Sequence, residues 1–323
     1  MSGEDSEFDH IRKRLAPLSA DAAGAFNLSD DAALMQPRSG YEVVLTSDML
    51  VAGVHFLDKD PAADIAAKAL AVSLSDLAAM GADARFYMTS ISWPDAAKSA
   101  QRDAFCEGLK AAQAEWGVTL IGGDTTSTPG PWTIAVTAIG EAPQGASMTR
   151  SGAKAGEAVW VSGEIGGAGL GLAMAKGERK KSAGLVKRYR RPEPRLALGR
   201  ALRGLASSVI DVSDGLLADL GHIARVSGVA MRIEAESVPV PAEIRREAAE
   251  AGAEVLIAPL TSGDDYELAF TAPKTLSGRI HAVSERLGLP LTQIGETLAG
   301  EGVSLVEASG VELPFDKGGF THF

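Results

Sequence analysis

Acidic side chains follow apolar stretches at several places in this chain, and the clearest case is VIDVSDGLLADLGHI, residues 209–223. This stretch begins like a buried strand and continues like a helix. A helix N-cap would explain one acid at the junction, because Ser213 or Asp214 could accept backbone N–H bonds. A cap leaves Asp211 unexplained. Acids in comparable positions are Asp30, Asp31, Asp48, Asp76 and Asp124.

Asp76 is the only charged residue between Ala69 and Ala82, where it continues an apolar stripe at helical spacing. A carboxylate on a buried face is costly without a partner. The residues leave two kinds of partner open. One is a cation of the chain, such as Lys68 or a distant arginine, and the other is a metal ion.

The whole set of acids favours the metal. Two carboxylates about 4 Å apart repel each other by roughly 4 kcal/mol at an effective dielectric near 20. If several acids converge, protonation or bound cations must relieve that repulsion. Oxygen ligands of this kind suit Mg²⁺ or Ca²⁺, and with 5 histidines the chain offers little to zinc. Magnesium held by carboxylates and by substrate phosphates is the expected use.

Phosphate groups would need backbone N–H groups or a cation. The chain has no GxxxxGK[ST] sequence, which excludes a P-loop. The Gly-rich run 163–171 fails the GxGxxG spacing because Leu172 takes the third glycine's place, so we interpret it as close helix packing. Gly122 and Gly123, beside Asp124, are better candidates. The positively charged guanidinium of Arg150 could donate two hydrogen bonds to the same phosphates.

The elements that would position these residues alternate between strands and helices, which predicts an α/β protein. A polar, Gly-rich stretch at 149–157 predicts the boundary between two domains, 1–148 and 149–323. The strand at 118–127 is expected to break at its glycine pair. We expect strands at 41–50, 85–93, 118–127, 131–142 and 267–272, and helices at 62–80, 95–116, 215–223 and 241–251.

Composition narrows the class of protein. The 323 residues suffice for roughly two domains, and the net charge of −11 argues against a nucleic-acid partner. No apolar run approaches the roughly 18 residues of a membrane helix. The acidic start MSGEDSEFDH is unlike a targeting signal, and the single Cys106 excludes a disulfide framework. We therefore expect a cytoplasmic protein that does not insert in membranes.

Eight stretches in order, over nearly the whole chain, resemble the thiamine-monophosphate kinase family of the aminoimidazole ribonucleotide synthetase superfamily. The resemblance implies two α/β domains with mixed sheets, each sheet with helices on one face. It also implies transfer of the γ-phosphoryl of ATP to thiamine phosphate, several Mg²⁺ ions, and a homodimer joined through the N-terminal sheets. The stretches are TSDMLVAGVHF, KALAVSLSDLAAMGA, LIGGDTT, MTRSGAKAGE, RPEPRLALG, IDVSDGLLADLGHI, SGDDYELAF and GGFTHF.

The resemblance also assigns residues by position. It places metal ligands at Asp31, Thr46, Ser47, Asp48, Asp76, Asp124, Asp211 and Asp214. It places ATP contacts at Gly122, Gly123, Arg150 and Ser213. It places substrate contacts at His55, Asp264 and Phe320. No general base is assigned, because the attacking phosphate oxygen is already ionised at neutral pH.

The chain departs from the family pattern at two points. The family usually has Gly-x-Gly where this chain has Asn27-Leu28-Ser29, so a turn that glycine permits is expected to be lost. The family often has Gly-Glu-Asp where this chain has Gly263-Asp264-Asp265. The shorter Asp264 would reach its target from farther away or through water.

Two other functions stay open at this point. The first is another ATP-using enzyme of the superfamily, of the selenophosphate synthetase kind. That enzyme needs a reactive cysteine near the N-terminus, and Cys106 is misplaced for it. The second is a non-catalytic sensor that binds ATP and cations, against which the complete set of acids argues.

Overall fold

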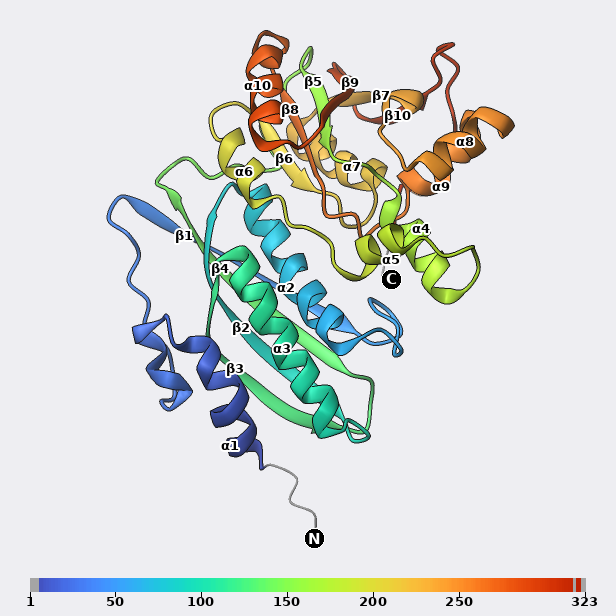
Figure 1. Cartoon of the computed structure of the whole chain (residues 1–323). Helices are drawn as coiled ribbons and strands as arrows, with labels where there is room; N and C mark the ends of the chain where they lie inside the picture. The colour runs from blue at the N-terminus through green and yellow to red at the C-terminus, as the bar shows by residue number, and fades with distance from the viewer. Residues whose placement is uncertain (1–5, 316–317, 321–323) are drawn as a thin grey trace. The chain divides into compact units, whose positions relative to one another are not determined.

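The computed structural model describes residues 6–315 and 318–320. Contacts within the chain divide it into two compact units. The first unit holds the residues up to Leu77 together with Asp83–Gly145, and the second holds Ala78–Ala82 and the residues from Ala146 onward. Figure 1 shows the elements of both. Among the described residues, no helix is long and apolar enough to cross a membrane.

The first unit is built on a mixed four-stranded sheet in the order β1-β4-β2-β3. β2 and β3 are parallel, and the other neighbours are antiparallel. Helices α2 and α3 cross one face of this sheet (Figure 1), as expected. The bounds are β1 Tyr41–Val51, α2 Ala62–Ala79, β2 Asp83–Pro94, α3 Ser99–Trp116, β3 Thr119–Thr128 and β4 Thr133–Pro143.

Alternation along β1 gives its two faces different surroundings. Val44 and Leu50 point inward and are buried, whereas Leu45 and Met49 are 65% and 60% exposed on the opposite face. The period of two places Thr46 and Asp48 on the inward face. β1 therefore presents its two polar candidates toward α2.

β3 does not break at its glycine pair, so that expectation was wrong. Gly122 and Gly123 pair in register with Met88 and Thr89 of β2, after a one-residue register shift. Gly123 has φ +148°, and a Cβ there would lie 1.9 Å from the carbonyl oxygen of Thr89. Glycine is needed at 123 because the two strands approach so closely.

The turn expected to be lost near residue 28 is present. Phe26, Asn27 and Leu28 all have left-handed backbone angles, with φ between 50° and 55°. Such angles cost L-residues about 1–2 kcal/mol each. Leu28 packs against the small cluster formed by Ala22, Ala25, Ile121 and Ile139. Packing of this N-terminal segment therefore holds a turn that glycine would adopt without strain.

The second unit is built on a mixed six-stranded sheet in the order β10-β7-β9-β5-β8-β6. The strands are β5 Ala158–Ser162, β6 Ser208–Asp211, β7 Ala230–Glu234, β8 Leu268–Ala272, β9 Leu291–Leu298 and β10 Gly302–Val306. The helices are α4 Gly167–Lys176, α5 Ala183–Arg190, α6 Leu196–Leu202, α7 Leu216–Ser227, α8 Ala242–Ala251, α9 Ile257–Leu260 and α10 Ser277–Leu287.

Helices cover both faces of the second sheet, whereas we expected them on one face. Val159 and Val161 of β5 belong to the large core cluster that includes Leu220 of α7. Between them, Trp160 points the other way and packs its ring edge-on against His281 of α10, with centroids 5.3 Å apart. This arrangement explains why every residue of β5 is buried.

Candidate active site

Four oxygen-bearing side chains gather between β1 and α2. The hydroxyl of Thr46 donates to the carboxylate of Asp76. One turn away on α2, Ser73 donates to Oδ2 of Asp48 at 2.8 Å. Burial, and then the charge of Asp76, raise the pKa of the Asp48 carboxyl to about 6. The two carboxylates are therefore close enough to interact electrostatically, as expected if the acids converge.

This donor set fits a hard divalent cation. All its atoms are oxygens, and the negative charge on Asp48 is disfavoured unless a positive charge compensates it. Ser47 is different: its side chain lies on the opposite face of β1, where its hydroxyl is 3.1 Å from that of Thr137. The structure thus brings Thr46, Asp48 and Asp76 together and leaves the Ser47 hydroxyl apart.

A second group of candidates lies around β3. Asp31, Gly122, Gly123 and Asp124 line one cavity of about 180 Å³. Strand register places Asp124 in line with Ser90, Ala135 and Met49, on the exposed face of the sheet. Asp48 faces the other way. Within the first unit, the candidate ligands therefore form two groups on opposite faces of one sheet.

His55 is held in a tight turn after β1. Its backbone carbonyl accepts a hydrogen bond from Nζ of Lys68 at 2.8 Å, and its Nδ1 accepts one from the backbone N–H of Val51 at 3.0 Å. A neutral imidazole that accepts at Nδ1 carries its proton on Nε2. This arrangement suits a hydrogen-bond donor to substrate better than a general base.

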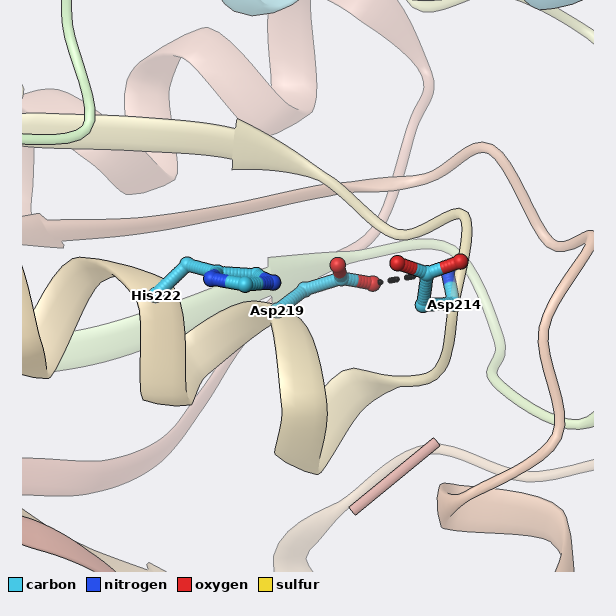
Figure 2. A group of neighbouring side chains, drawn as sticks. All are labelled: Asp214, Asp219 and His222. Carbon is cyan, nitrogen blue, oxygen red and sulfur yellow. Dashed lines mark hydrogen bonds between the residues drawn. The ribbon is translucent and has the colours of Figure 1, made fainter. Parts of the chain in front are cut away.

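In the second unit, the residues after β6 form a turn around one carboxylate. The backbone N–H groups of Ser213, Asp214 and Gly215 donate to Oδ2 of Asp219 at 3.0, 3.1 and 3.1 Å. Figure 2 shows the bond from Asp214. Burial, and then the charge of Asp214, raise the pKa of the Asp219 carboxyl to about 7. The alternative that Ser213 or Asp214 caps the helix is therefore wrong.

Asp219 is the residue whose role the sequence reasoning missed. The signal was available, because Asp219 stands on an apolar stripe with Leu216, Leu220 and Ile223. Asp76 was singled out by the same kind of pattern. Asp219 is absent from the residues assigned above from the sequence.

Two predicted substrate contacts are joined to this turn through the backbone. The N–H of Asp264 donates to the carbonyl of Ser213, and the N–H of Phe320 donates to the carbonyl of Asp214, both at 2.9 Å. Asp211 ends β6 and is buried. The second unit thus brings Asp211, Ser213, Asp214, Asp264 and Phe320 into one neighbourhood. The last three residues of GGFTHF lie outside the described residues.

Arg150 lies on a loop fixed by α7. Ser227 at the end of that helix donates to the Arg150 carbonyl at 3.3 Å and accepts from the N–H groups of Gly152 and Ala153. Burial, and then the charge of Arg150, lower the pKa of the His222 imidazole on α7. One ligand atom from each of Asp214, Asp219 and His222 falls within 4.8 Å of the others.

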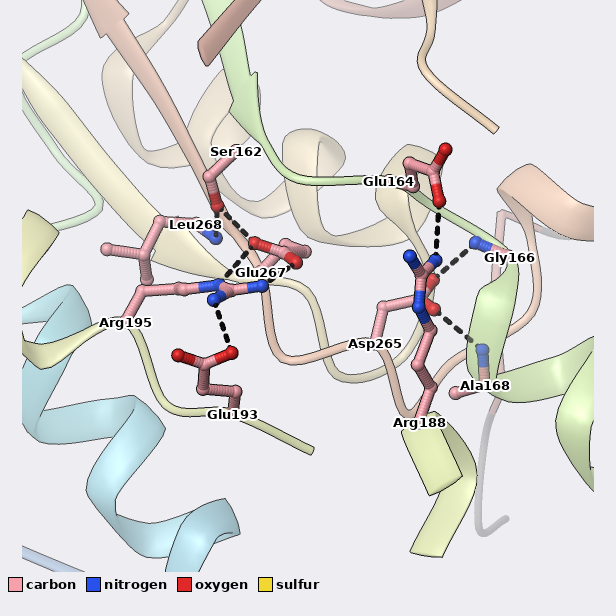
Figure 3. A network of polar contacts seen from close by, with 10 residues as sticks. All are labelled: Ser162, Glu164, Gly166, Ala168, Arg188, Glu193, Arg195, Asp265, Glu267 and Leu268. Carbon is pink, nitrogen blue, oxygen red and sulfur yellow. Dashed lines mark hydrogen bonds and ion pairs between the residues drawn. The ribbon is translucent and has the colours of Figure 1, made fainter. Parts of the chain in front are cut away.

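Backbone N–H groups of the Gly-rich run after β5 are hydrogen-bonded to an acid of the chain, Asp265. Asp265 accepts hydrogen bonds from the backbone N–H groups of Gly166 and Ala168 at 2.7 and 3.0 Å, at the start of α4 (Figure 3). Beside it, Arg195 forms an ion pair with the buried Glu267. A carboxylate therefore fills the position that a dinucleotide phosphate would take, which agrees with our rejection of that function for residues 163–171.

Comparisons with known proteins first establish the class. The family model for the N-terminal domain of AIR synthase related proteins matches residues 29–142, and the model for the C-terminal domain matches residues 154–307. Together with the two mixed sheets, these matches make the chain an AIR synthase related protein.

Individual relatives establish the family. The thiamine-monophosphate kinase of Caulobacter vibrioides is 40% identical over 302 residues, which cover 93% of this chain and 86% of that protein. The crystal structure of the thiamine-monophosphate kinase from Stenotrophomonas maltophilia K279a aligns with a TM-score of 0.81 at 40% identity, over 94% and 96% of the two chains. AaThiL complexed with AMPPCP and TMP aligns with a TM-score of 0.76 at 28% identity, over 100% of both chains.

The chain belongs to the thiamine-monophosphate kinase family. It is an ATP-dependent kinase that phosphorylates thiamine monophosphate to the diphosphate. The family assignment made from the eight stretches is thereby confirmed.

A ligand role for Asp76 predicts how Mg²⁺ changes the melting temperature of the protein. In EDTA, Asp76→Asn should keep or raise the melting temperature, because the substitution removes a charge that repels Asp48. Mg²⁺ should then raise the melting temperature of the unsubstituted protein by several degrees and that of the variant much less, since a ligand at 100 times its Kd stabilises by about 2.7 kcal/mol. Differential scanning calorimetry measures both effects.

The exposed Asp58 supplies the control for this experiment. Asp58→Asn removes the same charge from a surface loop and should leave both melting temperatures unchanged. Equal Mg²⁺ stabilisation of Asp76→Asn and the unsubstituted protein would contradict the ligand role of Asp76.

Proposed function

We propose that the kinase transfers the γ-phosphoryl group of ATP directly to the phosphate of thiamine phosphate, with Mg²⁺ bound to its carboxylates. The observation that supports this most is the arrangement of Thr46, Asp48 and Asp76, an oxygen-only set whose charges call for cations. An oxygen of the acceptor phosphate forms the new P–O bond. The bond between the γ-phosphorus and the β–γ bridging oxygen breaks, and ADP leaves.

The proposal assigns three sets of residues. The metal ions would be held by Asp31, Thr46, Ser47, Asp48, Asp76, Asp124, Asp211 and Asp214, with Ser47 contributing through its backbone if it shares a site with Asp48. ATP would contact Gly122, Gly123, Arg150 and Ser213. Thiamine phosphate would contact His55, Asp264 and Phe320. Residues 1–148 would thus supply most metal ligands, and residues 149–323 would complete the site.

Charge is the main obstacle to this reaction, because two phosphate groups must approach each other. When bound, Mg²⁺ neutralises phosphate charge and orients the reacting oxygens. The chain's own task is to position the groups. Arg150 would add a planar cation to the nucleotide phosphates. His55, with its proton on Nε2, would donate a hydrogen bond to the substrate. No side chain has to remove a proton.

The cellular site we propose is the cytoplasm. The net charge of −11 and the single cysteine agree with it. An acidic surface would also keep nucleic acid away, so the expected partners are ATP, thiamine phosphate and a second copy of the chain.

A direct kinase assay tests the proposal. With ATP and Mg²⁺, the protein should form thiamine diphosphate from thiamine phosphate, and EDTA should abolish the product. Unphosphorylated thiamine should give none, since it lacks the attacking phosphate. Asp124→Asn should lower kcat by orders of magnitude. Product from thiamine, or full activity of folded Asp124→Asn, would contradict the mechanism.

Phe320 is 51% exposed and therefore available to a ligand. Stacking on an aromatic ring of thiamine phosphate would contribute roughly 0.5–1.5 kcal/mol beyond burial. Phe320→Ala should raise the KM for thiamine phosphate several-fold and change the KM for ATP little. The exposed Phe8 on the first unit provides a matched control, Phe8→Ala. Equal weakening of both substrates would instead indicate a structural role for Phe320.

We infer that the protein is a homodimer joined through the first unit's sheet. Val43, Leu45 and Met49 of β1 point away from α2 and are exposed. A row of exposed apolar side chains on a sheet face is typical of a buried interface. A second copy of the same face would cover it.

Analytical ultracentrifugation should give twice the chain mass at micromolar concentration. Leu45→Glu places a charge in the proposed interface and should shift the protein toward monomer. Val311→Glu, at a 58% exposed residue of the second unit, should leave the mass unchanged. A fully active monomer of the unsubstituted chain would contradict the dimer.

A further inference from the structure

Asp219 binds a turn that precedes its own helix. α7 begins at Leu216, yet the three N–H groups that donate to Oδ2 of Asp219 belong to residues 213–215. A carboxylate whose only task was to start α7 would bind N–H groups of the helix's own first turn. Asp219 instead fixes the backbone that carries Ser213 and Asp214.

The carbonyl groups of the same turn are also used. Those of Ser213 and Asp214 accept hydrogen bonds from the N–H groups of Asp264 and Phe320. The segment at Gly263 lies very close to this turn. A Cβ at Gly263 would lie 2.1 Å from the Ser213 carbonyl oxygen. The turn is therefore gripped on one side by Asp219 and on the other by the two segments that carry proposed substrate contacts.

Backbone strain marks one of those segments. Asp264 has φ 75°, a left-handed angle, and its carboxylate accepts a hydrogen bond from the Tyr266 hydroxyl at 3.1 Å. The N–H of Tyr266 in turn donates to the carbonyl of Val212 at 2.8 Å. Strained residues persist only where their surroundings hold them. Residues 212–214 provide that hold through the carbonyls of Val212 and Ser213.

Asp219 itself is well placed to act as the anchor. Its side chain is 2% exposed, and one of its oxygens accepts all three bonds. Figure 2 shows its carboxylate directed at the turn and away from the flanking helix backbone. A single side chain thus determines the orientation of three consecutive peptide groups.

We propose that Asp219 is a positioning residue of the kinase. It holds the turn 213–215 so that the nucleotide contact Ser213 and the metal ligand Asp214 are oriented together, and through the turn's carbonyls it aligns Asp264 and Phe320 on the substrate side. The proposal rests on the roles assigned above to those four residues. Asp219 itself touches neither substrate.

Two substitutions of Asp219 separate its effects. Asp219→Asn keeps the shape and one accepting oxygen but loses the charge, whereas Asp219→Ala removes the acceptor. Glu157→Gln is the matched control, because Glu157 is a buried carboxylate of the same unit that accepts the N–H of Lys154 and contacts none of the site residues named above. The glutamine variant should behave as the unsubstituted protein does.

Hydrogen exchange measures the turn without substrates or metal. In Asp219→Ala, a peptide covering residues 209–217 should exchange its amides at least ten-fold faster, while peptides from the rest of α7 stay protected. Asp219→Asn should give an intermediate rate. In steady-state assays, kcat should fall at least ten-fold in Asp219→Ala, the KM values for ATP and thiamine phosphate should both rise, and Asp219→Asn should restore most of the activity.

Unchanged amide exchange in both variants, or altered kinetics with a fully protected turn, would overturn the positioning role. If Asp219→Ala does not fold, the graded effect in Asp219→Asn decides by the same criteria. If the turn exchanges faster in Asp219→Ala but the kinetics are unchanged, the activity of Asp214→Asn decides between two explanations. If that variant is inactive, the positioning role of Asp219 is refuted. If it is fully active, the ligand role proposed for Asp214 has failed instead, and the turn has no site residue to position.

Discussion

Repulsion between carboxylates is the constraint on which the first unit depends. Asp48 and Asp76 lie on neighbouring elements, and burial together with the charge of Asp76 disfavours the charge of Asp48. Hydroxyl groups of Thr46 and Ser73 soften this repulsion but supply no positive charge. Most side chains of α2 are small and buried, and Asp76 stands among them. A bound cation, as proposed for this site, would relieve that repulsion.

In the second unit, irregular backbone is held by buried carboxylates that accept hydrogen bonds from peptide N–H groups. This arrangement occurs at two places. Asp219 binds the turn after β6, and Asp265 binds the start of α4. In both cases an acid of the chain takes hydrogen bonds that an external anion could take. The N–H groups at these two places are therefore already satisfied by the chain itself.

Sequence reasoning recovered the family and the elements of the first unit because both depend on local patterns. Alternation of apolar and polar residues predicted the strand at 85–93, and the lone acid on an apolar stripe singled out Asp76. It failed where long-range packing decides. β3 runs through its glycine pair because Thr89 of the neighbouring strand pairs with it, and residues 26–28 keep their turn because Leu28 is packed. The separation of Asp48 from Asp124 depends on register across four strands, and the role of Asp219 on a turn closed by distant residues.

β1 carries two incompatible surfaces on alternate residues, and this restricts how the gene can vary. Moving the strand by one residue would exchange Thr46 and Asp48 with Leu45 and Met49, so both surfaces would be lost at once. Deleting a single codon within β1 is thus more damaging than deleting several from the loops at either end. Changes in length among descendants of this gene must accumulate outside residues 41–51, and recombination breakpoints should avoid them.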